Sequence, residues 1–213
     1  MSTVLKRCVP VVFAVALVLL VITASIALPI YIRPFYYAHI DALALDTASG
    51  FTHSQIRGAY DAVLDYLTLP NAPFSTGELR YSAEGAAHFA DCKGLFDLNA
   101  DVLLLSGAVV LAILLLRRRG KAPSLRRAVF FAGVGSVALP LVIGGLAALD
   151  FDRAFVIFHQ IFFPGKDNWL FNPRTDEIIL VLPQQFFMNC AILIGAGLLV
   201  FSLILLWLGR KHQ

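Results

Sequence analysis

Residues 9–30 read VPVVFAVALVLLVITASIALPI, an unbroken run of 22 residues that contains no Asp, Glu, Lys or Arg. A helix that crosses the roughly 30 Å hydrocarbon core of a bilayer needs about 20 apolar residues, so this run predicts a transmembrane helix. Ser25-Ile26-Ala27 resembles a signal-peptide cleavage site, which makes a cleaved signal peptide the alternative. The apolar run is longer than the roughly 7 to 15 residues of a signal-peptide core, and this favours a retained span.

The composition of the whole chain indicates the same class of protein. Of its 213 residues, 59% are apolar and only 15% are charged, with a mean hydropathy of +0.78. Soluble proteins carry about a quarter charged residues and fewer apolar ones. Two more uncharged runs cover residues 128–149 and 186–208, and a shorter one is extended to residues 95–116. We therefore predict an all-α membrane protein with four transmembrane helices in a single membrane domain, residues 1–213.

The distribution of charge predicts which segments face the cytoplasm, because cytoplasmic loops are enriched in Lys and Arg. Basic residues cluster before the first span, between the second and third, and after the fourth. All 14 acidic residues lie in residues 31–101 or 150–185. The net charge of +3 is too small to suggest nucleic-acid binding, and three Cys give no disulfide framework. The predicted cytoplasmic segments are residues 1–8, 117–127 and 209–213, and the extracytoplasmic ones are residues 31–94 and 150–185, with both termini cytoplasmic.

The extracytoplasmic segments are predicted to form a small, mainly helical cap. Thr52 and Gln55 have the spacing of a capping box before a helically periodic apolar run, and Ser82 is a predicted N-cap of a helix that continues into the second span. The Phe residues of 151–162 recur at helical spacing, which predicts an interfacial helix. The turn-rich residues 172–176 lie between two β-favouring runs and predict one short β-hairpin.

Glu84, His88 and Asp91 are spaced so that they share one face of the predicted helix. From residue types alone, a solvated ion-pair face is favoured over a catalytic site, and a metal site is the third alternative. No H-E-x-x-H or paired-Cys motif is present, and the nucleophile elbow G-x-S-x-G is absent. We therefore expect no metal site, no cofactor and no serine esterase of that kind.

Several motifs in both cap segments carry a family resemblance. They are YSAE (81–84), HFADCKGLF (88–96), FHQIFF (158–163), WLFNP (169–173), TD (175–176) and LPQQFF (182–187). In this order they resemble the Lit family of lipoprotein intramolecular transacylases, and the four-span layout matches as well. Cys92, Gln160 and Asn172 depart from the family pattern, in which Val is usual at the first position and Asp is frequent at the third.

The resemblance implies an acyltransferase in the bacterial cell membrane, a multi-pass protein with its active site at the extracytoplasmic face. Its substrate would be a diacylglyceryl-modified lipoprotein, whose sn-2 acyl chain moves to the α-amino group of its own N-terminal Cys and leaves a lyso-form product. Membrane lipid is the other expected partner. The competing hypothesis is a non-enzymatic four-helix membrane subunit whose extracytoplasmic segments bind a partner or a metal.

The resemblance also implies the site residues. His88 and His159 are expected to be a catalytic acid–base pair. Asp91 is expected to orient His88 or hold the substrate amine, and Lys93 to neutralise the tetrahedral oxyanion. Trp169 is a candidate substrate contact, although an aromatic membrane anchor is the favoured interpretation of this residue.

Overall fold

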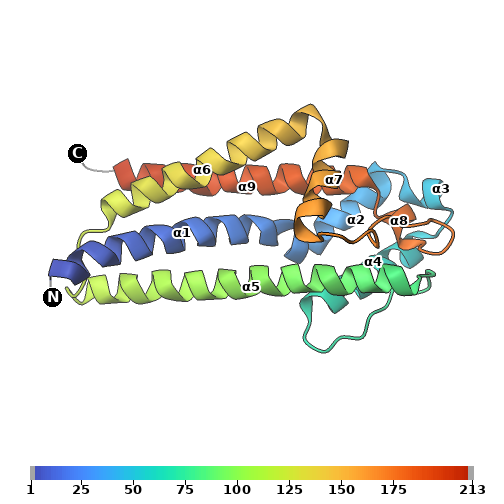
Figure 1. Cartoon of the computed structure of the whole chain (residues 1–213), viewed down its shortest axis with the longest axis horizontal. Helices are drawn as coiled ribbons and strands as arrows, with labels where there is room; N and C mark the ends of the chain where they lie inside the picture. Colours follow the sequence, from blue (N-terminus) through green and yellow to red (C-terminus); the bar gives the residue numbers. More distant parts are fainter. Residues whose placement is uncertain (1–2, 211–213) are drawn as a thin grey trace. The chain divides into compact units, whose positions relative to one another are not determined.

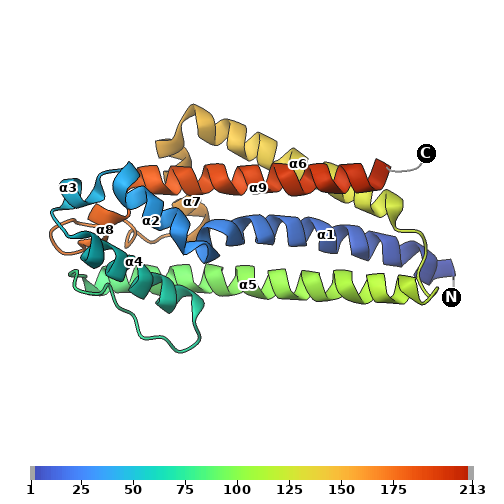
Figure 2. The same ribbon diagram turned by 180° about the vertical axis from the view of Figure 1, so that it is seen from behind.

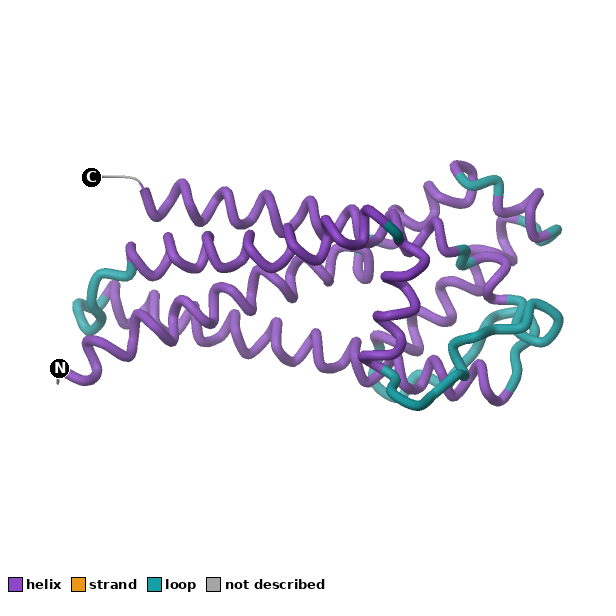
Figure 3. Tube along the Cα trace, turned by 45° about the horizontal axis from the view of Figure 1, so that its top comes forward, coloured by secondary structure: helices purple, strands orange, loops and turns teal. Residues whose placement is uncertain are grey.

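The computed structural model describes the backbone of residues 3–210 and the side chains of residues 8–138, 144–145 and 149–210. Its regular elements are α-helices, and Figure 3 shows no strand within residues 3–210. The helices labelled in Figure 1 are α1 (Thr3–Tyr31), α2 (Arg33–Ala42), α3 (Leu45–Ser49), α4 (His53–Thr68), α5 (Ala83–Arg118), α6 (Arg126–Leu149), α7 (Phe151–Phe162), α8 (Ile178–Val181) and α9 (Gln184–Arg210).

The chain divides into two compact units. Unit 1 consists of Met1–Leu28, Asn99–Leu149 and Ile192–Gln213, and unit 2 of Pro29–Leu98 and Asp150–Ala191. The prediction from the sequence was one membrane domain, residues 1–213. Both predicted cap segments, residues 31–94 and 150–185, fall inside unit 2. Helices α1, α5 and α9 each belong partly to both units, so the cap is continuous in sequence with three of the long apolar helices.

Among the described residues, three helices are long and apolar enough to cross a membrane, and they match three of the four predicted spans. They are Cys8–Tyr31 of α1, Ala83–Arg118 and Gln184–Arg210. In α5 the uncharged part begins at Val102, directly after the last acidic residue of this helix, Asp101. The span predicted at residues 128–149 coincides with α6, but the side chains of residues 139–143 and 146–148 lie outside the described residues. That span stays a prediction.

Unit 1 is held together by small residues that let helix backbones approach closely. A Cβ atom built at Gly209 would lie 2.7 Å from Cα of Phe130, and one at Gly133 would lie 3.0 Å from the backbone N of Leu206. Larger side chains at these two positions would therefore push α6 and α9 apart. The start of α1, the α5–α6 connection and the last turn of α9 lie at the same end of unit 1 (Figures 1 and 2).

Unit 2 has a buried aromatic core of the kind found in water-soluble domains. Tyr36 and Tyr60 stack with their ring centroids 3.8 Å apart, and the Phe186 ring packs edge-on against Tyr36 at 5.0 Å. The fully buried Tyr36 hydroxyl donates a hydrogen bond to the Val181 carbonyl at 2.7 Å. This bond links α2, in the first segment of unit 2 (Pro29–Leu98), to α8, in its second segment (Asp150–Ala191).

The predicted β-hairpin is wrong. Residues 172–176 do form a turn, but the apolar run after them folds into the one-turn helix α8, with Ile178 and Val181 buried in the core of unit 2. A short apolar run reads equally well as a buried strand or a buried helical turn. The contacts of these side chains in the core decide between the two.

The helix starts of the cap agree with the predicted capping residues. Thr52 and Gln55 form both bonds of a capping box at the start of α4. The Ser82 hydroxyl accepts a hydrogen bond from the Gly85 N–H at 2.9 Å, which caps α5, and the Asp150 carboxylate caps α7 in the same way through the Arg153 N–H. These caps satisfy N–H groups that have no partner within the helix.

Candidate active site

His88 and His159 come together in unit 2, although 71 positions separate them in the chain. His88 lies in the second turn of α5 and His159 in the last turns of α7. Their ring centroids are 5.8 Å apart, with an angle of 32° between the ring planes. Both side chains are buried, with exposed fractions of 6% and 7%. Residues 88 and 159 therefore form one enclosed imidazole pair.

Aromatic rings form the walls around this pair. Phe163 and Phe171 meet the His88 ring edge-on, at centroid distances of 5.0 and 5.5 Å. Trp169 stacks on the His159 ring at 4.5 Å, and its indole N–H donates to the Lys166 carbonyl. Trp169 is therefore in direct contact with the pair.

Burial in this aromatic pocket keeps both imidazoles neutral. Desolvation, reinforced by the neighbouring His159, lowers the pKa of His88 to about 4. Desolvation also lowers the pKa of His159, against a hydrogen bond to the Phe155 carbonyl that acts in the opposite direction. A charged imidazolium is disfavoured where water is excluded, so each ring has a free lone pair at neutral pH.

The hydrogen bonds of the two rings differ. Nδ1 of His159 lies 2.7 Å from the Phe155 carbonyl oxygen, which can only accept, so Nδ1 carries the proton and Nε2 is the free acceptor. Nε2 of His88 lies 3.4 Å from the Cys92 sulfur. Nδ1 of His88 is buried and has no hydrogen-bond partner within the described part of the chain. Buried polar atoms without a partner are uncommon, so this nitrogen is available for a ligand.

Asp91 bonds to a loop rather than to His88. Its carboxylate accepts a hydrogen bond from the Lys166 ammonium at 2.5 Å and one from the Asn168 amide at 3.2 Å. These bonds lower the pKa of Asp91, with the Lys166 hydrogen bond as the largest cause. The loop that they fix to α5 also carries Trp169. Asp91 is thus placed to hold one aromatic wall of the imidazole pair.

Lys93 lies two residues further along α5 and has other partners. Its ammonium donates to the carbonyls of Tyr66 and Leu69, at 2.9 and 3.3 Å, in the last turn and at the C-cap of α4. An ion pair with Asp97 at 3.6 Å adds to these contacts. Among the contacts of the described residues, none connects Lys93 to either histidine. The cation whose charge acts on His88 is Lys166, which the sequence analysis did not single out.

A second feature that the sequence analysis missed is the anchor of the turn at residues 172–177. The buried carboxylate of Asp176 accepts hydrogen bonds from the backbone N–H and the hydroxyl of Ser82, both at 2.8 Å. A Cβ atom at Gly85 would lie only 2.1 Å from Oδ1 of Asp176, so glycine is required there. This anchor holds Phe171 against His88. Asp176 belongs to the turn-rich residues 172–176, and its position in the sequence gives no signal of the contact with α5.

Among the described residues, no three His, Cys, Asp or Glu side chains are grouped so that they could hold a metal ion. The other two histidines of unit 2 are His39 and His53. His53 is exposed beside Asp41 and Asp46, but Nε2 of His39 bonds to the amide of Asn189 at 2.9 Å. That bond gives Asn189 the partner that a polar residue in an apolar helix requires.

Comparison with known proteins supports the family suggested by the motifs. The structure of the membrane-integral lipoprotein intramolecular transacylase Lit from Bacillus cereus has a TM-score of 0.89, at 24% identity over 98% of this chain and 96% of that chain. Two structures of variants of that protein, with one histidine replaced by arginine or by alanine, each have a TM-score of 0.80 at 24% identity. They cover 90% and 92% of those chains and 96% of this one, and all three show a shared fold.

A search of curated proteins gives no match. The model of one protein family, described as lipoprotein intramolecular transacylase Lit, matches residues 11–187, most of the chain. The chain therefore belongs to the Lit family of lipoprotein intramolecular transacylases, and it is a membrane-integral acyltransferase.

Proposed function

We propose that this enzyme moves the sn-2 acyl chain of a diacylglyceryl-modified lipoprotein to the α-amino group of the same molecule's N-terminal Cys, using His88 and His159 as an acid–base pair. The observation that carries the proposal is the enclosed imidazole pair, with ring centroids 5.8 Å apart. In the reaction a C–N bond forms at the ester carbonyl, and the bond from that carbon to the glyceryl oxygen breaks. One proton moves in total, from the nitrogen to the glyceryl oxygen.

The hydrogen bonds of the two rings support a division of roles. Because Nδ1 of His159 donates to the Phe155 carbonyl, Nε2 has a lone pair and is the base that takes the proton from the attacking amine. His88 donates to the glyceryl oxygen as the C–O bond breaks, and the proton taken from the amine restores it. The buried Nδ1 of His88 is the nitrogen available for this contact, because Nε2 lies beside Cys92.

A base is useful because the amine attacks only in its neutral form, and an α-amino group has a pKa of about 7.7 to 8.0. The lowered pKa of both histidines keeps the rings neutral at that pH. Since the ester and the amine belong to one molecule, holding them in contact converts the reaction to an intramolecular one. Orientation of this kind contributes roughly 7 to 11 kcal/mol in the best cases.

The aromatic walls and the loop bonded to Asp91 position the substrate. Trp169, in contact with His159, packs against the acyl chain or the glyceryl group, and the Asp91–Lys166 ion pair holds the loop that carries it. The role of Lys93 at the oxyanion stays a prediction, and its bonds to the Tyr66 and Leu69 carbonyls do not support it. No metal or cofactor is required by this scheme.

The distribution of charge supports a site at the extracytoplasmic face of the bacterial cell membrane, with both termini cytoplasmic. All acidic residues precede Val102 or lie between Leu149 and Phe186, and the basic clusters lie in the remaining segments. A lipid-borne ester at the outer headgroups is then within reach of both histidines.

Replacement of either histidine tests the proposal. We expect His88→Ala and His159→Ala each to lower the rate of acyl transfer by about 10² to 10⁴, the usual contribution of acid–base catalysis. The measurement is mass spectrometry of the N-terminal peptide of a reporter lipoprotein, which separates the diacylglyceryl form from the lyso-form. His53→Ala, at an exposed position of unit 2, is the matched control and keeps the wild-type rate. Lyso-form product at the wild-type rate from both His88→Ala and His159→Ala refutes the pair.

A further inference from the structure

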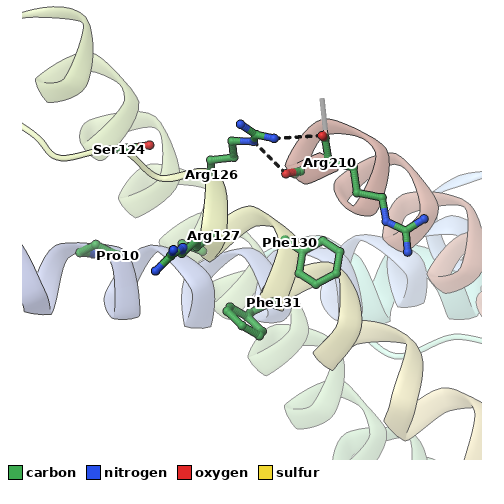
Figure 4. Close-up of a pocket in the computed structure, with 9 residues that line it drawn as sticks. Pro10, Ser124, Arg126, Arg127, Phe130, Phe131 and Arg210 are labelled. Carbon is green, nitrogen blue, oxygen red and sulfur yellow. Dashed lines mark hydrogen bonds between the residues drawn. The ribbon is translucent and has the colours of Figure 1, made fainter. Parts of the chain in front are cut away.

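The imidazole pair has one polar neighbour to which the proposed mechanism gives no task, the thiol of Cys92. Its sulfur lies 3.4 Å from Nε2 of His88, one helical turn further along α5. Within the part of the chain that the structure describes, the thiol makes no other hydrogen bond. The cavity of about 910 Å³ in unit 1, drawn in Figure 4, has no His or Cys among the residues that line it. The contact between thiol and imidazole therefore belongs to the pocket of unit 2 and not to that cavity.

The contact between Cys92 and His88 can be made in two ways, because a thiol and a neutral imidazole can each donate or accept. If Nε2–H donates to sulfur, the S–H group and the buried Nδ1 of His88 are both left without a partner. If S–H donates to Nε2, the proton of the ring is on Nδ1, and only this N–H is left for a ligand. The second arrangement leaves fewer buried polar groups unsatisfied, and it is therefore the more stable one.

The thiol of Cys92 keeps the proton that this arrangement requires. Burial raises the pKa of Cys92 to about 12, and the charge of Asp91 acts in the same direction. The thiolate, which is the nucleophilic form of cysteine, is therefore a minor form at neutral pH. Cys92 is suited to donate a hydrogen bond, and it is not suited to take up the acyl chain itself.

We propose that Cys92 is a positioning residue that holds the ring proton of His88 on Nδ1 and thereby makes His88 the acid of the pair. His159 is fixed in a complementary way, because its Nδ1 donates to the Phe155 carbonyl and leaves the lone pair on Nε2. One ring then offers an N–H and the other a lone pair, which is what proton transfer from the amine to the glyceryl oxygen requires. With the other tautomer of His88, both rings would offer lone pairs and the glyceryl oxygen would have no donor.

This inference rests on the proposed acid–base function of His88 and His159, and it adds the group that assigns their roles. The proton of the thiol stays on sulfur, and no bond to Cys92 is formed or broken. Because Val is usual at this position in the family pattern, the inference describes a property of this chain. It predicts a moderate loss of rate without Cys92 rather than an inactive enzyme.

NMR spectroscopy of the whole protein in detergent, isotopically labelled at the histidine ring nitrogens, tests the proposal directly. We expect the wild type to carry the ring proton of His88 on Nδ1, and Cys92→Ser to do the same because a hydroxyl also donates. Cys92→Val has a side chain of similar size but no donor, and we expect a mixture of the two tautomers. The His88 signals are identified by their absence from the spectrum of His88→Ala. A role of Cys92 in packing alone would not change the tautomer.

The rate of acyl transfer gives the second measurement. We expect Cys92→Val to lower kcat about three- to tenfold, the range that corresponds to the loss of one hydrogen bond. KM should stay unchanged, because the thiol contacts His88 and not the substrate. Cys92→Ser should keep kcat within about twofold of the wild type. The matched control is Cys190→Val, which removes the other half-buried thiol that packs against the same core of unit 2 and keeps the wild-type kcat and tautomer.

Four results would overturn the proposal. They are a wild-type His88 with its proton on Nε2, an unchanged tautomer in Cys92→Val, an equal loss of kcat in Cys92→Ser and Cys92→Val, and an acyl thioester on Cys92 in the stopped reaction. The rates of His88→Ala and His159→Ala are measured in parallel. Wild-type rates in both refute the acid–base pair itself, whereas low rates in both, together with an unchanged tautomer in Cys92→Val, refute only the role of Cys92.

Discussion

Units 1 and 2 differ in the kind of side chain that each exposes. Within the described residues the ion pairs all lie in unit 2, among them Arg80–Glu177 and Lys166–Asp91, each at 2.5 Å. Unit 1 instead exposes large apolar side chains such as Leu104 and Leu105, at 71% and 68%. Charged side chains are stabilised by hydration on a surface that faces water, but not on one that faces lipid. The surface of unit 2 therefore resembles that of a soluble domain, and the surface of unit 1 resembles that of a membrane helix bundle.

The buried polar groups show the same difference. In unit 2, the Asp176 carboxylate is 3% exposed and accepts hydrogen bonds from Ser82 and Thr175. In unit 1, the hydroxyls of Ser136 and Ser202 are fully buried, and within the described residues neither has a hydrogen-bond partner. Ser136 and Ser202 are small, which permits close helix packing. In unit 2 the hydrogen bonds of the Asp176 carboxylate themselves stabilise the structure.

The largest effect is expected for Asp176→Ala, which removes the anchor between the turn and α5. The Ser82 N–H and two hydroxyls lose their acceptor, and we expect unit 2 to be destabilised by about 2 to 4 kcal/mol. Hydrogen–deuterium exchange should show lost protection in residues 81–96 and unchanged protection in residues 192–208. Asp176→Asn, which keeps one acceptor oxygen, is the control and should lose less. Equal loss of protection in both segments would mean that the two units unfold together.

Acidification should also separate the two units. The folded pKa of His88, about 4, and the lowered pKa of His159 both lie below the unfolded value of about 6.5. Between pH 6.5 and 4 the unfolded chain binds protons that the folded chain does not, so the stability of unit 2 falls as the pH decreases.

The measurement is hydrogen exchange at pH 7, 6 and 5, corrected for the intrinsic rate. Protection of residues 83–96 should decrease, and that of residues 102–116 and 192–208, which contain no His, Asp or Glu, should not. Acyl transfer should decrease as the pH falls and His159 becomes protonated, which its lowered pKa places below the ordinary histidine value of about 6.5. A constant protection of residues 83–96 would contradict the buried neutral pair.

The smallest effect is expected for Ser136→Ala in unit 1. Its hydroxyl is buried without a partner among the described residues, so its removal should change stability by less than about 0.5 kcal/mol. Ser25→Ala is the matched comparison, because the Ser25 hydroxyl donates to the Val21 carbonyl at 2.7 Å and its loss should cost more. Thermal unfolding of the purified protein gives both values. A large loss for Ser136→Ala would show that polar bonds also hold unit 1.

Much of unit 1 could be predicted, because a bilayer imposes a length and a composition on any helix that crosses it. The runs at residues 9–30 and 186–208 satisfied both conditions and are helical. The span at residues 95–116 was predicted by extending the uncharged run toward the N-terminus, because that run, which begins at Val102, is too short to cross a bilayer alone. The helix starts at Thr52 and Ser82 were predicted equally well, because a cap is a local interaction between residues close in sequence.

The candidate site was predictable in part. Motifs pointed to His88, His159 and Trp169, and these three meet in the structure. The partners of Asp91 and Lys93 were not predicted, because Lys166 and the carbonyls of Tyr66 and Leu69 are distant in sequence. The prediction of a β-hairpin was wrong because the apolar pattern of Ile178 to Leu182 is compatible with both a buried strand and a buried helical turn.

By itself, the sequence determined what the solvent enforces: which segments are apolar enough for lipid, where the basic residues gather, and where helices begin. Those properties depend on neighbours a few positions away. Only the tertiary structure decided that two imidazoles share one enclosed pocket, that Asp176 anchors the turn beside them, and that α8 is a helix. Each of these depends on which distant side chains exclude water from a buried group, and the free energy of that exclusion exists only once the chain has folded.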